Sequence, residues 1–197
     1  MNRIGWAFLA IFMVVAGLMA LLIDFGGASP PPKPVVADTP AGPSGRPPSG
    51  QLVLPVRGIG WSGIRNSYGE ARGGGERGHT GVDIMAPAGA PVVAAAPGTV
   101  EKLFYSNGGG GVAAYVRSPD RRFSYYYAHL AAYAPTLREG SAVQAGDPIG
   151  AVGDTGNAGA GNFHLHFGIE RLNPADPWYR GQAINPYPLL ARGRAGR

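Results

Sequence analysis

The stretch NFHLHFGIE, residues 162–170, places two histidines one residue apart in a segment that has the composition of a β-strand. Successive side chains of a strand point to opposite faces, so His164 and His166 share one face. The other face carries the apolar residues Phe163, Leu165, Phe167 and Ile169. This apolar face predicts a strand that covers a hydrophobic core. The two imidazoles, about 7 Å apart along the backbone, either face water or contribute to one site.

Similar short strand-like segments fill the chain from residue 51 onward. They are residues 51–56, 81–86, 90–96, 98–105, 111–117, 122–130 and 147–153. Turn signals rich in glycine, proline and asparagine separate these segments, and the glycine run at residues 108–111 predicts a hairpin turn. No long stretch after residue 50 has a helical apolar period. The pattern therefore predicts an all-β domain, an antiparallel sheet folded into an open, barrel-like sandwich of short strands.

The N-terminal region predicts a membrane-directed helix ahead of this domain. Arg3 precedes an uncharged run over residues 4–23, which is long enough to cross a bilayer. A retained anchor is the favoured interpretation, and the small residues at 26–29 leave open a cleaved signal over residues 1–28. Arg3 on the cytoplasmic side would place the rest of the chain in the cell envelope, either anchored in the cytoplasmic membrane with the domain in the periplasm or secreted after cleavage.

Residues 29–50 are rich in proline and small residues and contain no aromatic residue, which predicts a linker. The folded domain is expected over residues 51–190, followed by a basic tail over residues 191–197. The 197-residue chain has a formal net charge of +5, but its predicted domain contains eleven Lys and Arg against ten Asp and Glu. A nearly neutral domain outside the cytoplasm argues against nucleic acid as a partner.

Cysteine is absent, so any metal site must use nitrogen and oxygen ligands. All four histidines lie in the predicted domain: His79, His129, His164 and His166. His79 precedes Asp83 by four residues, and strand alternation places His129 on one face with Tyr125 and Tyr127. Singly, each histidine fits a surface pair or the edge of a core. Together they suit a zinc site with three protein ligands and one open position, the arrangement typical of catalysis.

These motifs resemble those of the lysostaphin-type (LytM-domain) zinc endopeptidases, which cut peptide bonds in bacterial cell-wall peptidoglycan. The resemblance runs from residue 67 to residue 174 and rests on H-x-x-x-D, Y-A-H, the glycine-punctuated VQAGDPIGAVGDTG and H-x-H. It implies that His79, Asp83 and His166 bind Zn²⁺, and that His129 and His164 are catalytic. The two histidines of the opening stretch would then have different tasks, one as a metal ligand and one in the reaction.

The resemblance implies metal-assisted hydrolysis, in which zinc lowers the pKa of a water molecule and polarises the scissile carbonyl. One of His129 and His164 would take the proton of the water and the other would stabilise the oxyanion, in an order that the sequence does not give. Tyr68 and Arg72 stand where the family often has a similar run, so we expect them to contact substrate. Peptidoglycan peptides are the implied partner, and no protein regulator is identified.

Two features depart from the family pattern. Phe163 occupies the position before H-x-H where proline is common, and the loop TGNAGAGN at residues 155–162 is longer than usual. Both differences bear on substrate fit and leave the ligand set unchanged. The alternative function is that of an inactive relative, which would bind peptidoglycan and activate other wall hydrolases. The presence of all five key residues favours the enzyme.

Overall fold

The computed structural model describes residues 52–192 of the chain. The predicted membrane segment at residues 1–28, the linker at residues 29–50 and the last five residues of the chain lie outside this range. Within the described range, no helix has both the length and the apolar character needed to cross a membrane. The described domain is mostly β, as the strand pattern predicts.

The main sheet of the described residues has nine strands. They are β3 (Gly81–Met85), β4 (Pro91–Val93), β5 (Gly98–Ser106), β6 (Gly111–Arg117), β7 (Phe123–Tyr133), β8 (Ala142–Val143), β9 (Pro148–Val152), β10 (His164–Arg171) and β11 (Gln182–Ile184). A separate small hairpin pairs β1 (Ala71–Arg72) with β2 (Arg77–Gly78) around the 3-10 turn η2 (Gly73–Gly75). The remaining elements are the 3-10 turn η1 (Trp61–Gly63) and the helix α2 (Tyr187–Arg192).

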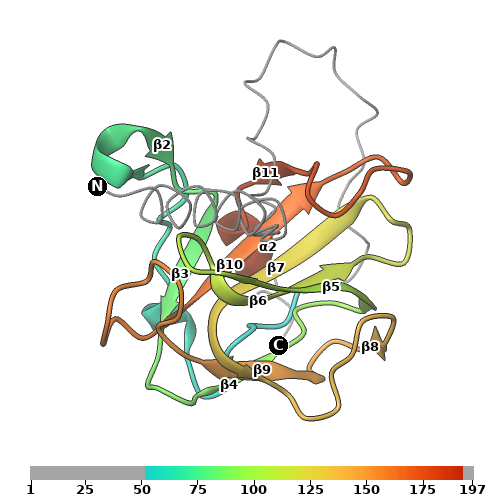
Figure 1. The fold of residues 1–197 in the computed structure, drawn as a ribbon, viewed down its shortest axis with the longest axis horizontal. Coiled ribbons are helices and arrows are strands. Elements are labelled where there is room, and N and C mark those ends of the chain that lie inside the picture. Colours follow the sequence, from blue (N-terminus) through green and yellow to red (C-terminus); the bar gives the residue numbers. More distant parts are fainter. Residues whose placement is uncertain (1–51, 193–197) are drawn as a thin grey trace, which may run out of the picture. The chain divides into compact units, whose positions relative to one another are not determined.

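The sheet has the order β11-β10-β7-β6-β5-β8, and its strand pairs are antiparallel. β3 pairs with the first half of β10, β9 pairs with the second half of β7, and β4 pairs with β9 (Figure 1). The sheet is open rather than closed into a barrel. The glycine run at residues 108–111 joins β5 to β6 as the predicted hairpin turn.

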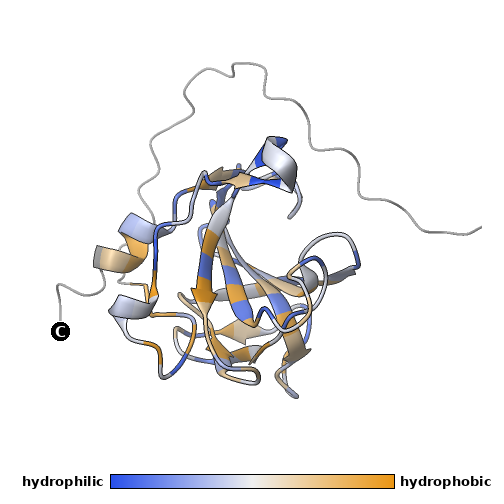
Figure 2. Cartoon of the chain, turned by 90° about the vertical axis from the view of Figure 1, so that its left-hand side faces the viewer, coloured by the Kyte–Doolittle hydropathy of each residue, from blue (hydrophilic) through white to orange (hydrophobic). Residues whose placement is uncertain are grey.

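The core lies on one face of this sheet. On β10, Leu165, Phe167 and Ile169 are each at most 1% exposed, while His164 and His166 point to the other face. Figure 2 shows the alternation as hydrophilic and hydrophobic bands along the strands. Burial of these large side chains stabilises the strand pairing by about 1.5–3 kcal/mol each. The prediction from NFHLHFGIE is therefore confirmed: one face covers the core and the other presents imidazoles.

Some short elements differ from the prediction. Residues 52–55 form no strand, and Val56 makes only an isolated bridge to Val92. β8, β11 and α2 were not expected, because two to six residues are too few to show a period of 2.0 or 3.6. α2 nevertheless contributes the fully buried Leu190 to the core.

The prediction that His129 shares a face with Tyr125 and Tyr127 is wrong. The two tyrosines are at most 1% exposed in the core, whereas the His129 ring lies 4.7 Å from the His164 ring on the opposite face. Between Tyr127 and Leu130, β7 has one residue more than its partner β6, and His129 has a φ of 61°. This β-bulge breaks the alternation and turns His129 to the histidine face.

Candidate metal centre and active site

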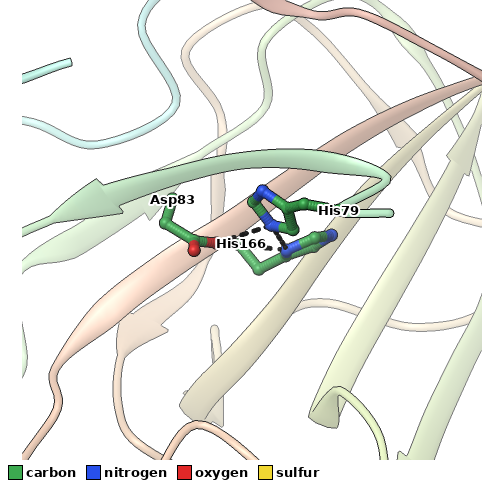
Figure 3. Close-up of side chains that lie close together, drawn as sticks. All are labelled: His79, Asp83 and His166. Carbon is green, nitrogen blue, oxygen red and sulfur yellow. Dashed lines mark hydrogen bonds and ion pairs between the residues drawn. The ribbon is translucent and has the colours of Figure 1, made fainter. Parts of the chain in front are cut away.

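His79, Asp83 and His166 direct one ligand atom each toward a common point (Figure 3). His79 Nε2 lies 2.8 Å from His166 Nδ1, and Asp83 Oδ1 lies 3.0 Å and 3.2 Å from these two nitrogens. Ligand atoms around a tetrahedral zinc ion are roughly 3.3 Å apart when the bonds are 2.0–2.1 Å long. Two imidazoles and one carboxylate in this arrangement therefore form a site that a small divalent cation fits.

The pairing of β3 with β10 brings these residues together, because Asp83 and His166 are direct partners in the register. His79 lies two residues before β3 and reaches the same point. Gly81 leaves space for the imidazole of His166. A Cβ atom at Gly81 would lie 2.8 Å from His166 Nε2 and 2.4 Å from the carbonyl oxygen of Phe167. Only glycine fits at this place in β3 without displacing the ring.

Ser67 and Arg72 contact the proposed metal ligands His79 and Asp83. His79 Nδ1 lies 2.8 Å from the carbonyl oxygen of Ser67, and the Asp83 backbone N–H donates to Ser67 Oγ at 3.1 Å. The Arg72 guanidinium donates to Asp83 Oδ2 at 2.7 Å, which leaves Oδ1 directed at the two imidazoles. Such partners fix the tautomer of a histidine ligand and the orientation of a carboxylate.

The protonation states also suit metal binding. Burial acts to raise the pKa of Asp83, but hydrogen bonds to His166 and His79 hold it well below its usual range, so the carboxylate is ionised. Burial lowers the pKa of His166, which favours the neutral imidazole. Metal ligands must be deprotonated, and both groups meet this requirement at neutral pH.

His129 and His164 lie beside the ligand cluster. The His129 ring centroid is 4.7 Å from that of His164 and 6.0 Å from that of His166. His164 Nε2 is 3.7 Å from Asp83 Oδ1. The cluster of three ligand atoms contains His166 and does not contain His164. Each ring is oriented by a carbonyl oxygen at 2.8 Å from its Nδ1, Thr155 for His129 and Asn162 for His164.

The environment of His129 suits proton transfer. Burial lowers the pKa of His129 to about 4, so its imidazole is neutral near pH 7 and can accept a proton. Its φ of 61° is unusual for a residue other than glycine. Backbone hydrogen bonds to Gly110 and from Gly153 hold this conformation. Strained backbone of this kind concentrates at functional sites.

Tyr68 and Arg72, the predicted substrate contacts, have partners within the protein. The Tyr68 hydroxyl donates to the carbonyl oxygen of Ala183 at 3.1 Å, and Arg72 contacts Asp83 as described. The carbonyl groups of Ser67, Thr155 and Asn162 were missed by the sequence reasoning. Every residue has a backbone carbonyl group, so the residue type at these positions does not indicate the contact.

The long loop at residues 155–162 covers the turn between β5 and β6. The Asn157 N–H donates to the carbonyl oxygen of Gly109 at 2.9 Å. Thr155 Oγ1 donates to the carbonyl oxygen of Leu130 and accepts from the Val112 N–H, at 2.8 Å and 3.0 Å. These contacts place the Thr155 carbonyl at His129. The loop therefore positions a predicted catalytic residue.

The chain is similar to several known proteins. An L-Ala–D-Glu endopeptidase of Bacillus subtilis is 37% identical over 132 residues, which cover 64% of this chain and 39% of the relative. A peptidoglycan DD-endopeptidase of Vibrio cholerae is 32% identical over 95 residues, covering 48% and 21%. The solved catalytic domain of lysostaphin from Staphylococcus simulans superposes with a TM-score of 0.53 at 30% identity, covering 65% of this chain and 91% of that one.

The chain spans less than half the length of these two curated relatives. The family model for peptidase family M23 matches residues 77–186, more than half of the chain. The matched segment contains the three clustered residues and both flanking histidines. The predicted resemblance to lysostaphin-type peptidases is thus confirmed, and the chain belongs to peptidase family M23.

Proposed function

We propose that this chain is a zinc metalloendopeptidase that hydrolyses peptide bonds in bacterial cell-wall peptidoglycan. The observation that carries the proposal is the convergence of His79, Asp83 and His166 beside two further oriented imidazoles. Zinc suits the mixed nitrogen and oxygen donors and is held by three protein ligands at catalytic sites. Related chains named for peptidoglycan endopeptidases support the substrate class.

A zinc ion at this cluster would supply a Lewis acid for the scissile carbonyl and lower the pKa of a water molecule. The chain supplies the proton transfer. His129 is neutral near pH 7 and is held by the Thr155 carbonyl, so it is placed to take the proton of the water. His164 Nδ1 donates to the Asn162 carbonyl, which leaves Nε2 facing the cluster. In its imidazolium form, with a proton on both ring nitrogens, His164 would donate from Nε2 to the developing oxyanion.

The relatives do not agree on one bond. One is named for L-Ala–D-Glu cleavage and another for DD-endopeptidase activity. The bond cut by this chain is therefore determined by identifying the reaction products. The full chain is incubated with purified cell walls, with and without a chelator, and the released fragments are identified by mass spectrometry.

We expect new peptide termini that appear with zinc, disappear on chelation and return when zinc is restored. Wall binding without any new terminus at equal zinc loading would contradict the proposal and favour the inactive activator module. Release of reducing sugar ends without new peptide termini would contradict the endopeptidase assignment itself.

We also propose that the domain works outside the cytoplasm, tethered by residues 1–28 and spaced from the membrane by residues 29–50. The uncharged run after Arg3 and the proline-rich segment support this arrangement. Cell fractionation tests it, and we expect the mature protein in the membrane fraction with an intact N-terminus. A soluble mature form that begins near Ser29 would refute the anchor.

A further inference from the structure

A row of aromatic side chains leads away from the metal centre across the histidine face of the sheet. The Tyr126 ring lies edge-on to His166 at 5.7 Å, and Tyr115 stacks on Tyr126 at 4.5 Å. Trp178 follows at 4.7 Å from Tyr115, with Phe104 5.4 Å beyond it. We call these four residues, Tyr126, Tyr115, Trp178 and Phe104, the aromatic row.

The aromatic row lies on the open side of the sheet. All four residues of the row are partly exposed. In contrast, Tyr125 and Tyr127, the neighbours of Tyr126 on β7, are completely buried on the other face. Tyr179, which is 48% exposed, continues the surface at 5.4 Å from Trp178. The aromatic row therefore lies outside the hydrophobic core, and its four residues are only partly covered beside the predicted active site.

The loop that carries Trp178 is held firmly by charged groups. It connects β10 to β11 and appears in orange to red in Figure 1. Arg117, 1% exposed, donates to the Asp176 carbonyl at 2.9 Å and forms an ion pair with Glu101, and Arg121 donates to the Pro174 carbonyl at 3.0 Å. The position of Trp178 is thus fixed in the free protein, and a ligand that stacks on it need not pay for ordering the loop.

A carboxylate lies beside the rings. Glu170 extends from β10, and a Cβ atom at Gly181 would lie 2.5 Å from its Oε2. Burial raises the pKa of Tyr126 to about 12; the hydrogen bond with Tyr115 acts in the opposite direction, and the charge of Glu170 adds to the rise.

The length of the row matches a short peptide. The centroid steps of 5.7, 4.5 and 4.7 Å place Trp178 at most about 15 Å from His166. An extended chain covers 3.3–3.6 Å per residue, so at most about four residues separate the scissile bond from Trp178. Peptidoglycan stem peptides are of this length and contain no large apolar side chains. The sugar rings to which they are attached present C–H faces that stack on aromatic rings.

We propose that Trp178 and Tyr115 form a subsite for a hexose ring of the glycan strand, so that the enzyme holds a stem peptide by its sugar end as well as at the scissile bond. The subsite rests on the proposed function for its substrate class. It would recognise the ring faces of the sugar by stacking on Trp178 and Tyr115.

The test compares Trp178→Ala with Tyr105→Ala in the zinc-loaded full chain. Tyr105 is an exposed tyrosine of β5 outside the aromatic row, 58% exposed, and serves as the matched control. Two substrates are used, a soluble cross-linked stem peptide without sugar and the same peptide carrying its disaccharide. Binding of peptide-free glycan strands is measured separately.

We expect Trp178→Ala to bind peptide-free glycan about tenfold more weakly and to lose the preference for the sugar-bearing peptide. Hydrolysis of the sugar-free peptide should stay within about twofold of the unmodified chain. Tyr105→Ala should change neither. Unchanged glycan binding by Trp178→Ala would overturn the subsite while leaving the endopeptidase assignment intact. Failure of the unmodified chain to cut either peptide would instead refute the proposed function.

A second measurement covers the case in which Trp178→Ala does not fold. The indole N–H resonance of Trp178 is assigned by its loss in Trp178→Phe and is followed in the unmodified chain during titration with peptide-free glycan. The proposal requires this resonance to shift. A resonance that stays fixed at saturating glycan would contradict it.

Discussion

At the scale of single residues, Arg72 has a different neighbour from the one expected. The sequence predicts contact with substrate, but the guanidinium binds Asp83 Oδ2 at 2.7 Å and approaches His79 Nδ1 at 3.3 Å. Both neighbours are proposed metal ligands. An arginine in this position orients the carboxylate and neutralises its second oxygen, so we expect it to contribute to metal affinity, while the contact with substrate stays a prediction.

We therefore expect Arg72→Ala to weaken zinc binding by about 10- to 100-fold, the usual effect of losing an outer partner of a ligand. Competition with a chelating dye measures the affinity. Arg65→Ala is the control, because within residues 52–192 the guanidinium of Arg65 pairs with Glu70 alone, at a site where the Arg65 side chain is 73% exposed. Unchanged zinc affinity together with a raised KM would restore the substrate role that the sequence suggests.

Gly81 is a second residue whose importance comes from its neighbour. The clash of an added Cβ with His166 Nε2 and with the Phe167 carbonyl oxygen predicts that Gly81→Ala moves the imidazole or separates β3 from β10. We expect zinc affinity to fall at least tenfold and thermal stability to fall as well. Gly108→Ala is the matched control, since a Cβ there meets no atom within 4 Å. Normal zinc binding by Gly81→Ala would show that the ring is not confined as described.

At the scale of elements, β7 shows where a pattern of residues stops predicting structure. Alternation correctly places Tyr125 and Tyr127 on one face, but it cannot register an inserted residue. The bulge turns His129 to the opposite face, and a second register shift follows between Leu130 and Ala132. β10 has no such irregularity within residues 164–171, and its two faces follow the sequence. Regular strands are predictable because local and tertiary preferences agree.

The loop between β10 and β11 depends on an ion pair at a neighbouring strand. Arg117→Met would leave Glu101, whose side chain is 20% exposed, without its main partner and would release the Asp176 carbonyl. We expect the free energy of unfolding to fall by about 2–4 kcal/mol, because removal of Arg117 leaves the largely buried charge of Glu101 without its main partner. Urea denaturation measures it.

Lys102→Ala provides the comparison for Arg117. Lys102 pairs with Glu139, and their side chains are 36% and 44% exposed. Exposed pairs contribute little, so the change should stay below about 1 kcal/mol. Equal destabilisation by the two variants would contradict a special role for Arg117 in holding the loop.

At the scale of the whole molecule, the open antiparallel sheet and the members of the site could be predicted from the sequence. Strand alternation locates the core, and four histidines in a cysteine-free domain define the candidate ligands. The aromatic row could not be predicted, because Phe104, Tyr115, Tyr126 and Trp178 come from four separate segments. Nothing local to any of these segments indicates that pairing of β5, β6 and β7 with a returning loop brings the rings together.

The central claim is that the four histidines serve two separate tasks at one metal site. It is tested most directly by measuring zinc content and wall-peptide hydrolysis together in four alanine variants of the full chain. His79→Ala and His166→Ala should lose zinc and activity together, because each removes one of three protein ligands. His129→Ala and His164→Ala should keep about one zinc per chain while the rate falls roughly a hundredfold or more. Loss of zinc from His164→Ala with retention by His166→Ala would contradict the account.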